Sequence, residues 1–318
     1  MSGQGEKQDR VRPGRWRLVA ACCAALAAGA AVLCWPLVVP VGPRSHWLLQ
    51  AAASRMFIVC AAVMLVCAVL FVAVGSMLWR AGRPYRTAGR GQQGVAIIEF
   101  ALALPFLLML GLLMAQASLL MVGNVCVHYA AFCATRTAIV VIPQDCGAGE
   151  PRNFILDSDD TTSKKYRVKL SAVTALLPVS CDSDDVIAAG EGGDAYVNGV
   201  TRFLSLQGVE KPAWADDRLS RKMAYAAGHT EVTVDAPQPR NDDKNGFFQE
   251  NEDVHVTVRH TFYLSVPTAA RIFGLFPGGV ELGFGQNEYG TGIVASYALP
   301  NEGVQDYVDI ETFPQDAK

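Results

Sequence analysis

Residues 94–105 read Gly-Val-Ala-Ile-Ile-Glu-Phe-Ala-Leu-Ala-Leu-Pro, and they open the longest uncharged segment of the chain. A single carboxylate, that of Glu99, stands at the head of this segment, and no further charged residue follows before Arg136. An ionisable side chain inside a membrane span is costly, so it is treated as functional and its partner is sought. The stretch therefore predicts a membrane helix with one special acidic position near its start.

The apolar residues of the chain are concentrated in three runs. The sequence has 318 residues, of which 51% are apolar and 18% are charged. Asp, Glu, Lys and Arg are absent from residues 18–43, 56–79 and 100–135. Each run exceeds the roughly 20 residues needed to cross a hydrocarbon core of about 30 Å. We expect three membrane helices, of which the first two form a hairpin over residues 18–79.

The charges are distributed unevenly along the chain. Residues 1–94 hold eleven Lys and Arg against two Asp and Glu, whereas residues 143–318 hold fifteen against twenty-seven. Basic residues that flank membrane spans tend to stay in the cytoplasm. The basic tail at 1–17 and the Gly/Arg-rich linker at 80–94 are therefore predicted to be cytoplasmic. The acidic C-terminal domain is predicted to lie outside the cytoplasmic membrane, and its charge argues against nucleic acid as a partner.

The third helix is expected over residues 95–142, with Pro143 as its stop. These 48 residues would extend for about 72 Å, so only the N-terminal half is needed to cross a bilayer. Pro105 is expected to bend the helix or to loosen one turn. The outer half would form a stalk with an alanine-rich face suited to packing on another helix or on the outer domain. This face consists of Ala130, Ala131, Ala134 and Ala138.

Residues 143–318 are predicted to form an α+β domain with an antiparallel sheet. Helical spacing of apolar residues favours helices at 165–178 and 216–227. Alternation favours strands at 229–235, 253–264 and 290–299. The middle strand would place Val254, Val256, Val258 and His260 on one face. The fold class is therefore an α+β membrane protein with a helical hairpin, a long membrane and stalk helix and an outer domain.

Two cysteines of the outer domain suggest a disulfide. Cys146 and Cys181 would face an oxidising compartment, where disulfides persist. The spacing is also compatible with both thiols staying unpaired, because a Cα separation cannot be read from sequence.

A polar stretch at residues 241–252 resembles a calcium-binding loop. Asp243, Asn245, Gly246 and Glu252 occupy loop positions 3, 5, 6 and 12. No helix pair is predicted to frame the stretch, so a polar hairpin loop with an Asn-Gly turn is the alternative. The sequence contains no His-Glu-x-x-His, Gly-x-Ser-x-Gly or Gly-x-x-x-x-Gly-Lys-Ser/Thr motif. We expect neither an enzyme nor a cofactor.

The motif at the start of the third helix resembles the TadE-like proteins of Flp (Tad) pilus assembly, a branch of the type IVb pilin system. The resemblance rests on Gly94, a four-residue apolar spacer, the pair Glu99-Phe100, Pro105 within an apolar helix, and the segment that ends in Ala134-Thr135-Arg136. The strand pattern from Val254, followed by Pro267 and a late strand, is also similar to the family's outer domain. The resemblance implies that a membrane-embedded prepilin peptidase cuts after Gly94, which makes Val95 the first mature residue. Its implied partners are other pilins or pilus-assembly components.

The residues also favour a role for Glu99 in assembly. Glu99 lies one turn beyond Val95, so a cut would create an amine that Glu99 of a neighbouring subunit can neutralise. The alternatives are that Glu99 reaches back to headgroup water or complements the helix dipole. The residues before the cut would either stay behind as a membrane hairpin or remain attached as an anchor. In the second case the chain is an uncleaved three-span envelope protein whose outer domain binds a partner or a cell-wall polymer.

Overall fold

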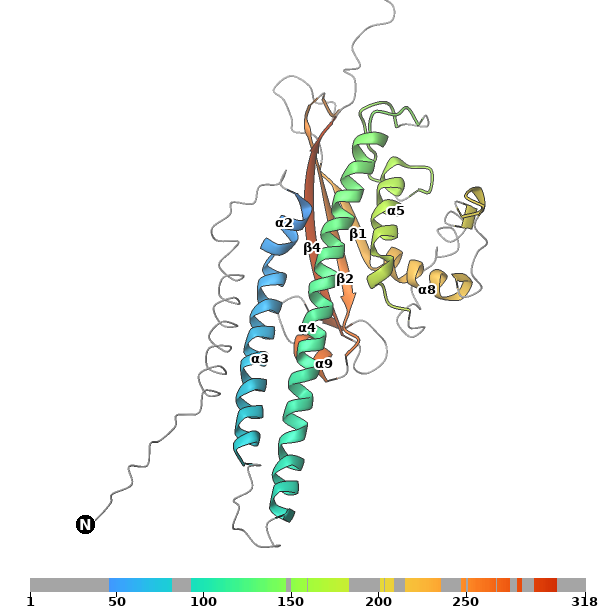
Figure 1. Ribbon diagram of the computed structural model, residues 1–318. Helices are drawn as coiled ribbons and strands as arrows, with labels where there is room; N and C mark the ends of the chain where they lie inside the picture. Colours follow the sequence, from blue (N-terminus) through green and yellow to red (C-terminus); the bar gives the residue numbers. More distant parts are fainter. Residues whose placement is uncertain are drawn as a thin grey trace, which may run out of the picture.

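The computed structural model describes residues 46–81, 93–146, 150–158, 160–182, 201–202, 204–208, 215–235, 247–249, 251–266, 268–274, 279–281 and 289–301. The helix expected near residues 18–39 lies outside this part of the chain. The same holds for most of the loop at 241–252, so the calcium prediction is not tested. Within the described part, the structure is an α+β fold built around one long helix (Figure 1).

That helix is α4, Gln93–Val141, with 49 residues and a length of about 74 Å. Its bounds lie within two residues of those expected from the sequence, and it remains helical through Pro105. Pro105 therefore does not interrupt α4. Beside its N-terminal half runs α3, Arg55–Ala81, which packs against α4 in the opposite direction (Figure 1).

A short helix that the sequence analysis did not predict precedes α3. This helix is α2, Trp47–Ala53, and it also contacts α4. Ser54 separates α2 from α3 because its backbone is extended, with φ −65° and ψ 146°. The Ser54 hydroxyl oxygen accepts from Phe57 N at 3.2 Å, as expected of an N-cap residue at the start of α3.

The sheet is antiparallel, with the order β1-β2-β4-β3. Its strands are β1, Thr230–Val234; β2, Asp253–Tyr263; β3, Gly279–Glu281; and β4, Tyr289–Pro300. The register of the central pair places Val258 opposite Ala295. Along β2 the alternation is confirmed, because Val254, Val256, Val258 and His260 are all buried. The short strand β3 was not predicted.

The C-terminal half of α4 lies across this sheet (Figure 1). Its alanine face is fully covered, which confirms the expectation that the face packs on another element; Ala130, Ala131, Ala134 and Ala138 are all buried. Small side chains let the helix axis approach the sheet closely. The approach is close at Gly123, where an added Cβ would lie 2.6 Å from the Phe262 ring.

The remaining helices complete the domain. They are α5, Lys164–Leu176; the 3₁₀ turn η1, Leu177–Val179; α8, Ala215–Gly228; and α9, Ala269–Gly274. Helix α5 packs beside α4 and β1, and α8 packs on α5. Ser163 caps α5 by accepting from Tyr166 N at 3.1 Å. Helix α9, which was not predicted, contacts α4 near the end of β2 (Figure 1).

Candidate functional site

Two described helices are long and apolar enough to cross a membrane. The candidate spans are Arg55–Ser76 in α3 and Phe100–Val141 in α4. Only 11% and 22% of their most apolar stretches are buried within the protein. The core helix of a soluble protein would be mostly buried, so these helices instead present much of their apolar surface to the surroundings. This arrangement is consistent with membrane association.

The predicted processing residues lie at the start of α4. Because the helix begins at Gln93, the bond between Gly94 and Val95 falls in the first helical turn, and Glu99 follows one turn later. A protease that cuts after Gly94 would approach an extended backbone, whereas here this residue is helical. The first four backbone N–H groups of a helix have no intrahelical partner, which makes this turn the easiest part of α4 to open. For residues 93–99 the structure describes the backbone alone.

Helix α4 changes its environment along its length. Phe100, Pro105 and Phe106 are exposed, with 68% of Phe106 accessible. The outer domain contacts the helix at Gln116, whose Oε1 accepts from Val266 N at 3.0 Å. From there to Ile142 the side facing the sheet is buried. This hydrogen bond to the outer domain lies within the N-terminal half of α4, the half that the sequence assigned to the membrane.

Helices α2 and α3 are joined to α4 by buried polar contacts at Asn124. Asn124 is 1% exposed, and its Nδ2 donates to Ala51 O at 2.9 Å. Its Oδ1 lies 2.9 Å from Ser54 Oγ. The Ser54 hydroxyl also lies 2.8 Å from Ala51 O, but it has one hydrogen to donate. Ala51 O already accepts from Asn124 Nδ2 and from Ser54 N at 3.3 Å, which uses both of its lone pairs, so we assign that hydrogen to Asn124 Oδ1.

Apolar contacts extend this joint on both sides of Asn124. Trp47 of α2 packs on Tyr129 of α4, with ring centroids 5.1 Å apart. Toward the other end, Cys60 of α3 is fully buried, as are Ala117 and Leu120 of α4 in the same cluster. The second helix of the expected hairpin is therefore packed along α4, and it does not merely precede it in the sequence.

A buried lysine closes the C-terminal end of α4. Lys164 Nζ donates to Ile142 O at 2.9 Å, Pro151 O at 2.7 Å and Phe154 O at 2.9 Å. Burial lowers the pKa of Lys164, and the nearby thiol of Cys146 and the carboxylate of Glu150 act in the opposite direction. The three carbonyl acceptors match the three donors of an ammonium group, so we assign Lys164 a structural role.

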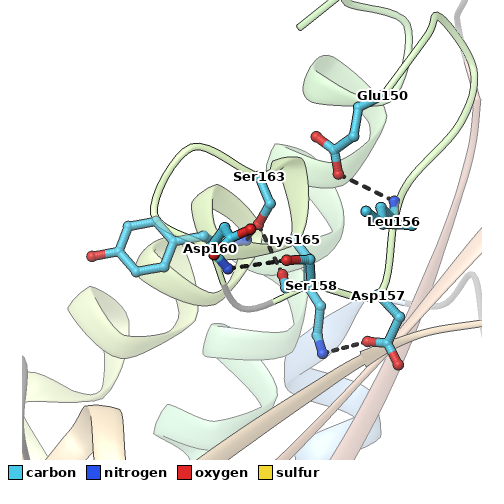
Figure 2. Close-up of polar contacts among 8 residues, drawn as sticks. Glu150, Leu156, Asp157, Ser158, Asp160, Ser163 and Lys165 are labelled. Carbon is cyan, nitrogen blue, oxygen red and sulfur yellow. Dashed lines mark hydrogen bonds and ion pairs between the residues drawn. The ribbon is translucent and has the colours of Figure 1, made fainter. Parts of the chain in front are cut away.

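Glu150 completes the same clamp. Its Oε2 accepts from Lys164 N at 2.8 Å, and its Oε1 accepts from Leu156 N at 3.2 Å. Figure 2 shows the second contact together with the surface ion pair between Lys165 and Asp157. The chain leaving α4 is thereby tied to the start of α5.

A second buried cluster lies where α8 meets the sheet. The Tyr225 ring packs against His229, with centroids 4.4 Å apart, and against His260, with centroids 6.0 Å apart. Tyr225 Oη donates to Thr261 O at 2.7 Å, and His260 Nδ1 lies 2.9 Å from Thr230 Oγ1. Burial, and after it the charge of His229, lower the pKa of His260 to about 4. His260 is therefore neutral at physiological pH.

A groove of about 400 Å³ runs beside this cluster. Its charged side chains include Lys165, Lys169, Glu231 and Arg259. Lys165 pairs with Asp157, and Glu231 lies directly opposite Arg259 on the neighbouring strand. The positive charges are thus largely balanced, and the groove offers little attraction to an anion.

The structure does not support the disulfide between Cys146 and Cys181. Both are present as thiols. Cys146 lies near the N-terminal end of α5, where it influences Lys164, and Cys181 follows η1 beyond the other end, where it influences Tyr225. The length of α5 alone is about 20 Å, whereas a disulfide requires Cα atoms within about 7 Å.

No group of three or more His, Cys, Asp or Glu among the described residues is arranged to hold a metal ion. Comparison with known proteins finds no matching family model, no matching curated protein and no matching solved structure. The resemblance to TadE-like proteins therefore stays a prediction that depends on the residues at the start of α4.

Sequence reasoning overlooked the polar joint at Asn124, although a signal was present. Between residues 100 and 134 of α4, the buried polar side chains are those of Gln116, Asn124 and His128. Their positions differ by multiples of four. This spacing places them on one face of a helix. Polar side chains that recur on one face of an apolar helix indicate a contact surface, which here is shared between α2, α3 and the outer domain.

Proposed function

We propose that this chain is a non-enzymatic pilus-assembly protein of pseudopilin type, similar to the TadE-like proteins. In this proposal the mature chain is anchored in the cytoplasmic membrane by the N-terminal half of α4, and its α+β domain lies outside. Its partners are other pilins or pilus-assembly components, and a prepilin peptidase that cuts after Gly94. Lipid contacts would hold the protein in the membrane, and contacts between the membrane helices of neighbouring subunits would hold it in the pilus assembly.

The two-part character of α4 is the observation that supports this function best. One continuous helix has an exposed apolar N-terminal half and a C-terminal half buried against a sheet. If the membrane ends where the domain begins, near Gln116, the segment from Val95 to Ala115 is about 31 Å long, which matches a hydrocarbon core. A subunit of this shape can pack its membrane helix against those of its neighbours while its domain stays in water.

Glu99 would set the register of this packing. A cut after Gly94 creates an amine at Val95, roughly 6 Å along the axis from Glu99. A carboxylate at this depth is stabilised when an amine of a neighbouring subunit lies beside it, and it is costly when unpaired. The chain would therefore favour one axial offset between neighbouring helices.

Two measurements test cleavage after Gly94 and filament assembly separately. The mass and N-terminal sequence of the protein extracted from native membranes should show a chain that starts at Val95. Glu99→Gln, which keeps the shape and removes the charge, should leave this N-terminus unchanged and abolish assembly of surface filaments. Gln93→Glu, a charge change outside the mature chain, serves as the control and should leave assembly intact. Normal filament numbers in Glu99→Gln would refute the role of the carboxylate.

A second candidate is favoured by the packing of α2 and α3 on α4. It is an uncleaved three-span envelope protein whose outer domain binds a partner or a cell-wall polymer. A buried contact at Asn124 between the hairpin and α4 would suit a permanent anchor. Recovery of the full-length chain as the sole form in native membranes would favour this candidate over the pseudopilin.

A further inference from the structure

We propose that residues 46–76 form a separable partner of α4, held through Asn124, which stays bound when the chain is cut between them. The partner surface on α4 extends from Ala117 to Tyr129. Its counterpart is the bent helical unit formed by α2 and α3. This inference goes beyond the proposed function, because it concerns how the two parts hold each other, whether or not a native peptidase cuts the chain.

The polar part of the interface depends on the break between α2 and α3. Ser54 adopts an extended backbone, so α2 ends and the carbonyl oxygen of Ala51 is turned toward Asn124. The same break places the Ser54 hydroxyl beside Asn124 Oδ1. One amide group thus contacts an acceptor and a donor that a continuous helix would not present together.

The orientation of the Asn124 amide follows from these two contacts. With Nδ2 toward Ala51 O, both contacts are hydrogen bonds. The flipped amide would set two carbonyl oxygens against each other and leave the Nδ2 group beside the hydroxyl. The observed orientation is therefore the one that satisfies both ends of the side chain.

The apolar part of the interface supplies area and close approach. Cys60 is 0% exposed, and it lies in one buried cluster with Ala117 and Leu120. Met56, Val63 and Met64 of α3 pack against that cluster. Trp47 covers Tyr129 at the other end. Small residues on both helices allow the axes to approach closely, which is the packing that membrane helices favour.

Asn124 makes this surface selective. An apolar helix of continuous form could cover Ala117 and Leu120, but it would leave a buried amide without partners, at a cost that disfavours binding. A helix that replaces α2 and α3 must therefore bring a hydroxyl next to a backbone carbonyl that can accept one further hydrogen bond, as Ala51 O does beside the bond from Ser54 N. Another copy of residues 46–76 meets this requirement, whereas the exposed apolar stretch of α4 around Leu104 does not.

The consequence for processing rests on the proposed function. If the chain is cut after Gly94, residues 1–94 would not be discarded as a leader peptide. They would remain as a bound companion that covers one face of α4 until a neighbour with matching chemistry takes its place.

The test uses a cut that is independent of any native peptidase. A recognition sequence for a specific protease is inserted within residues 82–92 of the full-length chain, and an affinity tag is placed at the C-terminus. After cleavage in mild detergent, the N-terminal fragment should co-purify with the tagged fragment. Its immediate separation from the unmutated protein would overturn the proposal.

Two serine variants then test the polar contact. Ser54→Ala removes the donor to Asn124 and should accelerate loss of the N-terminal fragment about tenfold. Ser76→Ala is the matched control, because Ser76 Oγ donates to Ala73 O within α3 at 2.7 Å. The control should release the fragment at the parental rate. Equal release from both variants would show that the contact at Asn124 does not hold the partner.

Asn124→Leu provides a second measurement on the other side of the interface. The loss of both polar contacts should release the fragment faster than Ser54→Ala does, while the uncut variant should keep the helical content and elution volume of the parent. Retention of the fragment at the parental rate would also contradict the proposal. Retention or release of the fragment says nothing about the N-terminus found in native membranes. A failure of the proposed helix contact is therefore distinguishable from a failure of the proposed pilus-assembly function.

Discussion

Lys164 Nζ lies 2.9 Å from the carbonyl oxygen of Ile142, the first residue beyond α4. The carbonyl groups at the C-terminal end of a helix lack intrahelical donors and carry partial negative charge. A buried ammonium group at this position satisfies one of them and also binds two carbonyls of the following loop. This contact links the longest helix to the rest of the outer domain.

Replacing this lysine should destabilise the domain. Lys164→Met keeps much of the side-chain volume but removes the ammonium donor from three carbonyl oxygens, of which that of Ile142 keeps a second donor, Asn153 N at 2.8 Å. We expect a loss of roughly 2–3 kcal/mol in the free energy of unfolding. Lys165→Met is the matched control, because its ion pair with Asp157 is at the surface and contributes about 0–1 kcal/mol. Denaturant unfolding of the full-length protein in detergent measures both. Equal stability of the two variants would contradict the clamp.

The close approach of α4 to the sheet predicts a steric effect at Gly123. Gly123→Ala places a methyl group 2.6 Å from the Phe262 ring, so the ring or the helix must shift. Overpacking of this kind costs about 1–3 kcal/mol, and the thermal midpoint should fall. Gly111→Ala is the control within the same helix, because nothing lies within 4 Å of its added Cβ. A fall of the same size in the control would show that helix packing on the sheet is not the cause.

His260 predicts a pH dependence of stability. Its pKa in the folded state is about 4, owing first to burial and then to His229, whereas an exposed histidine titrates near 6.5. The unfolded chain therefore binds the proton first as the pH falls. The stabilisation is fully present above pH 6.5 and is lost between about pH 6.5 and 4, at up to roughly 1.4 kcal/mol per pH unit.

The measurement compares the parent with His260→Gln, which cannot titrate. Thermal unfolding of the full-length protein at pH 7 and at pH 4.5 should show a smaller difference in the variant. Carboxylates that titrate in this range affect both proteins equally, so the comparison isolates position 260. An identical pH dependence in the two proteins would show that His260 does not bind its proton on unfolding.

The change of environment at Gln116 predicts a difference in lipid contact along α4. Leu108 and Val140 are both exposed in the isolated protein, at 58% and 60%. If the bilayer covers the segment before Gln116, tryptophan at position 108 contacts acyl chains and tryptophan at position 140 does not. Leu108→Trp in vesicles of brominated lipid should be strongly quenched relative to the parent, and Val140→Trp should not. Equal quenching would place the membrane boundary elsewhere.

Local sequence pattern was sufficient for most of the secondary structure. The apolar runs at residues 56–79 and 100–135 predict α3 and α4. In an apolar environment the backbone N–H and C=O groups must form their hydrogen bonds within the helix. Alternation along β2 predicts its buried face, because successive side chains of a strand point to opposite sides. The short elements α2, α9 and β3 were missed, since few residues carry little periodicity and their formation depends on contacts with α4 and β4.

The contacts between distant parts of the chain were decided by the tertiary structure alone. Ser54 and Asn124 are 70 positions apart, and Lys164 and Ile142 are 22 apart, so no local pattern pairs them. The sequence likewise left open whether Cys146 and Cys181 form a disulfide, and in the structure both are thiols that lie toward opposite ends of α5. Periodicity specifies which face of an element is buried, whereas the partner on that face depends on how all the elements pack together.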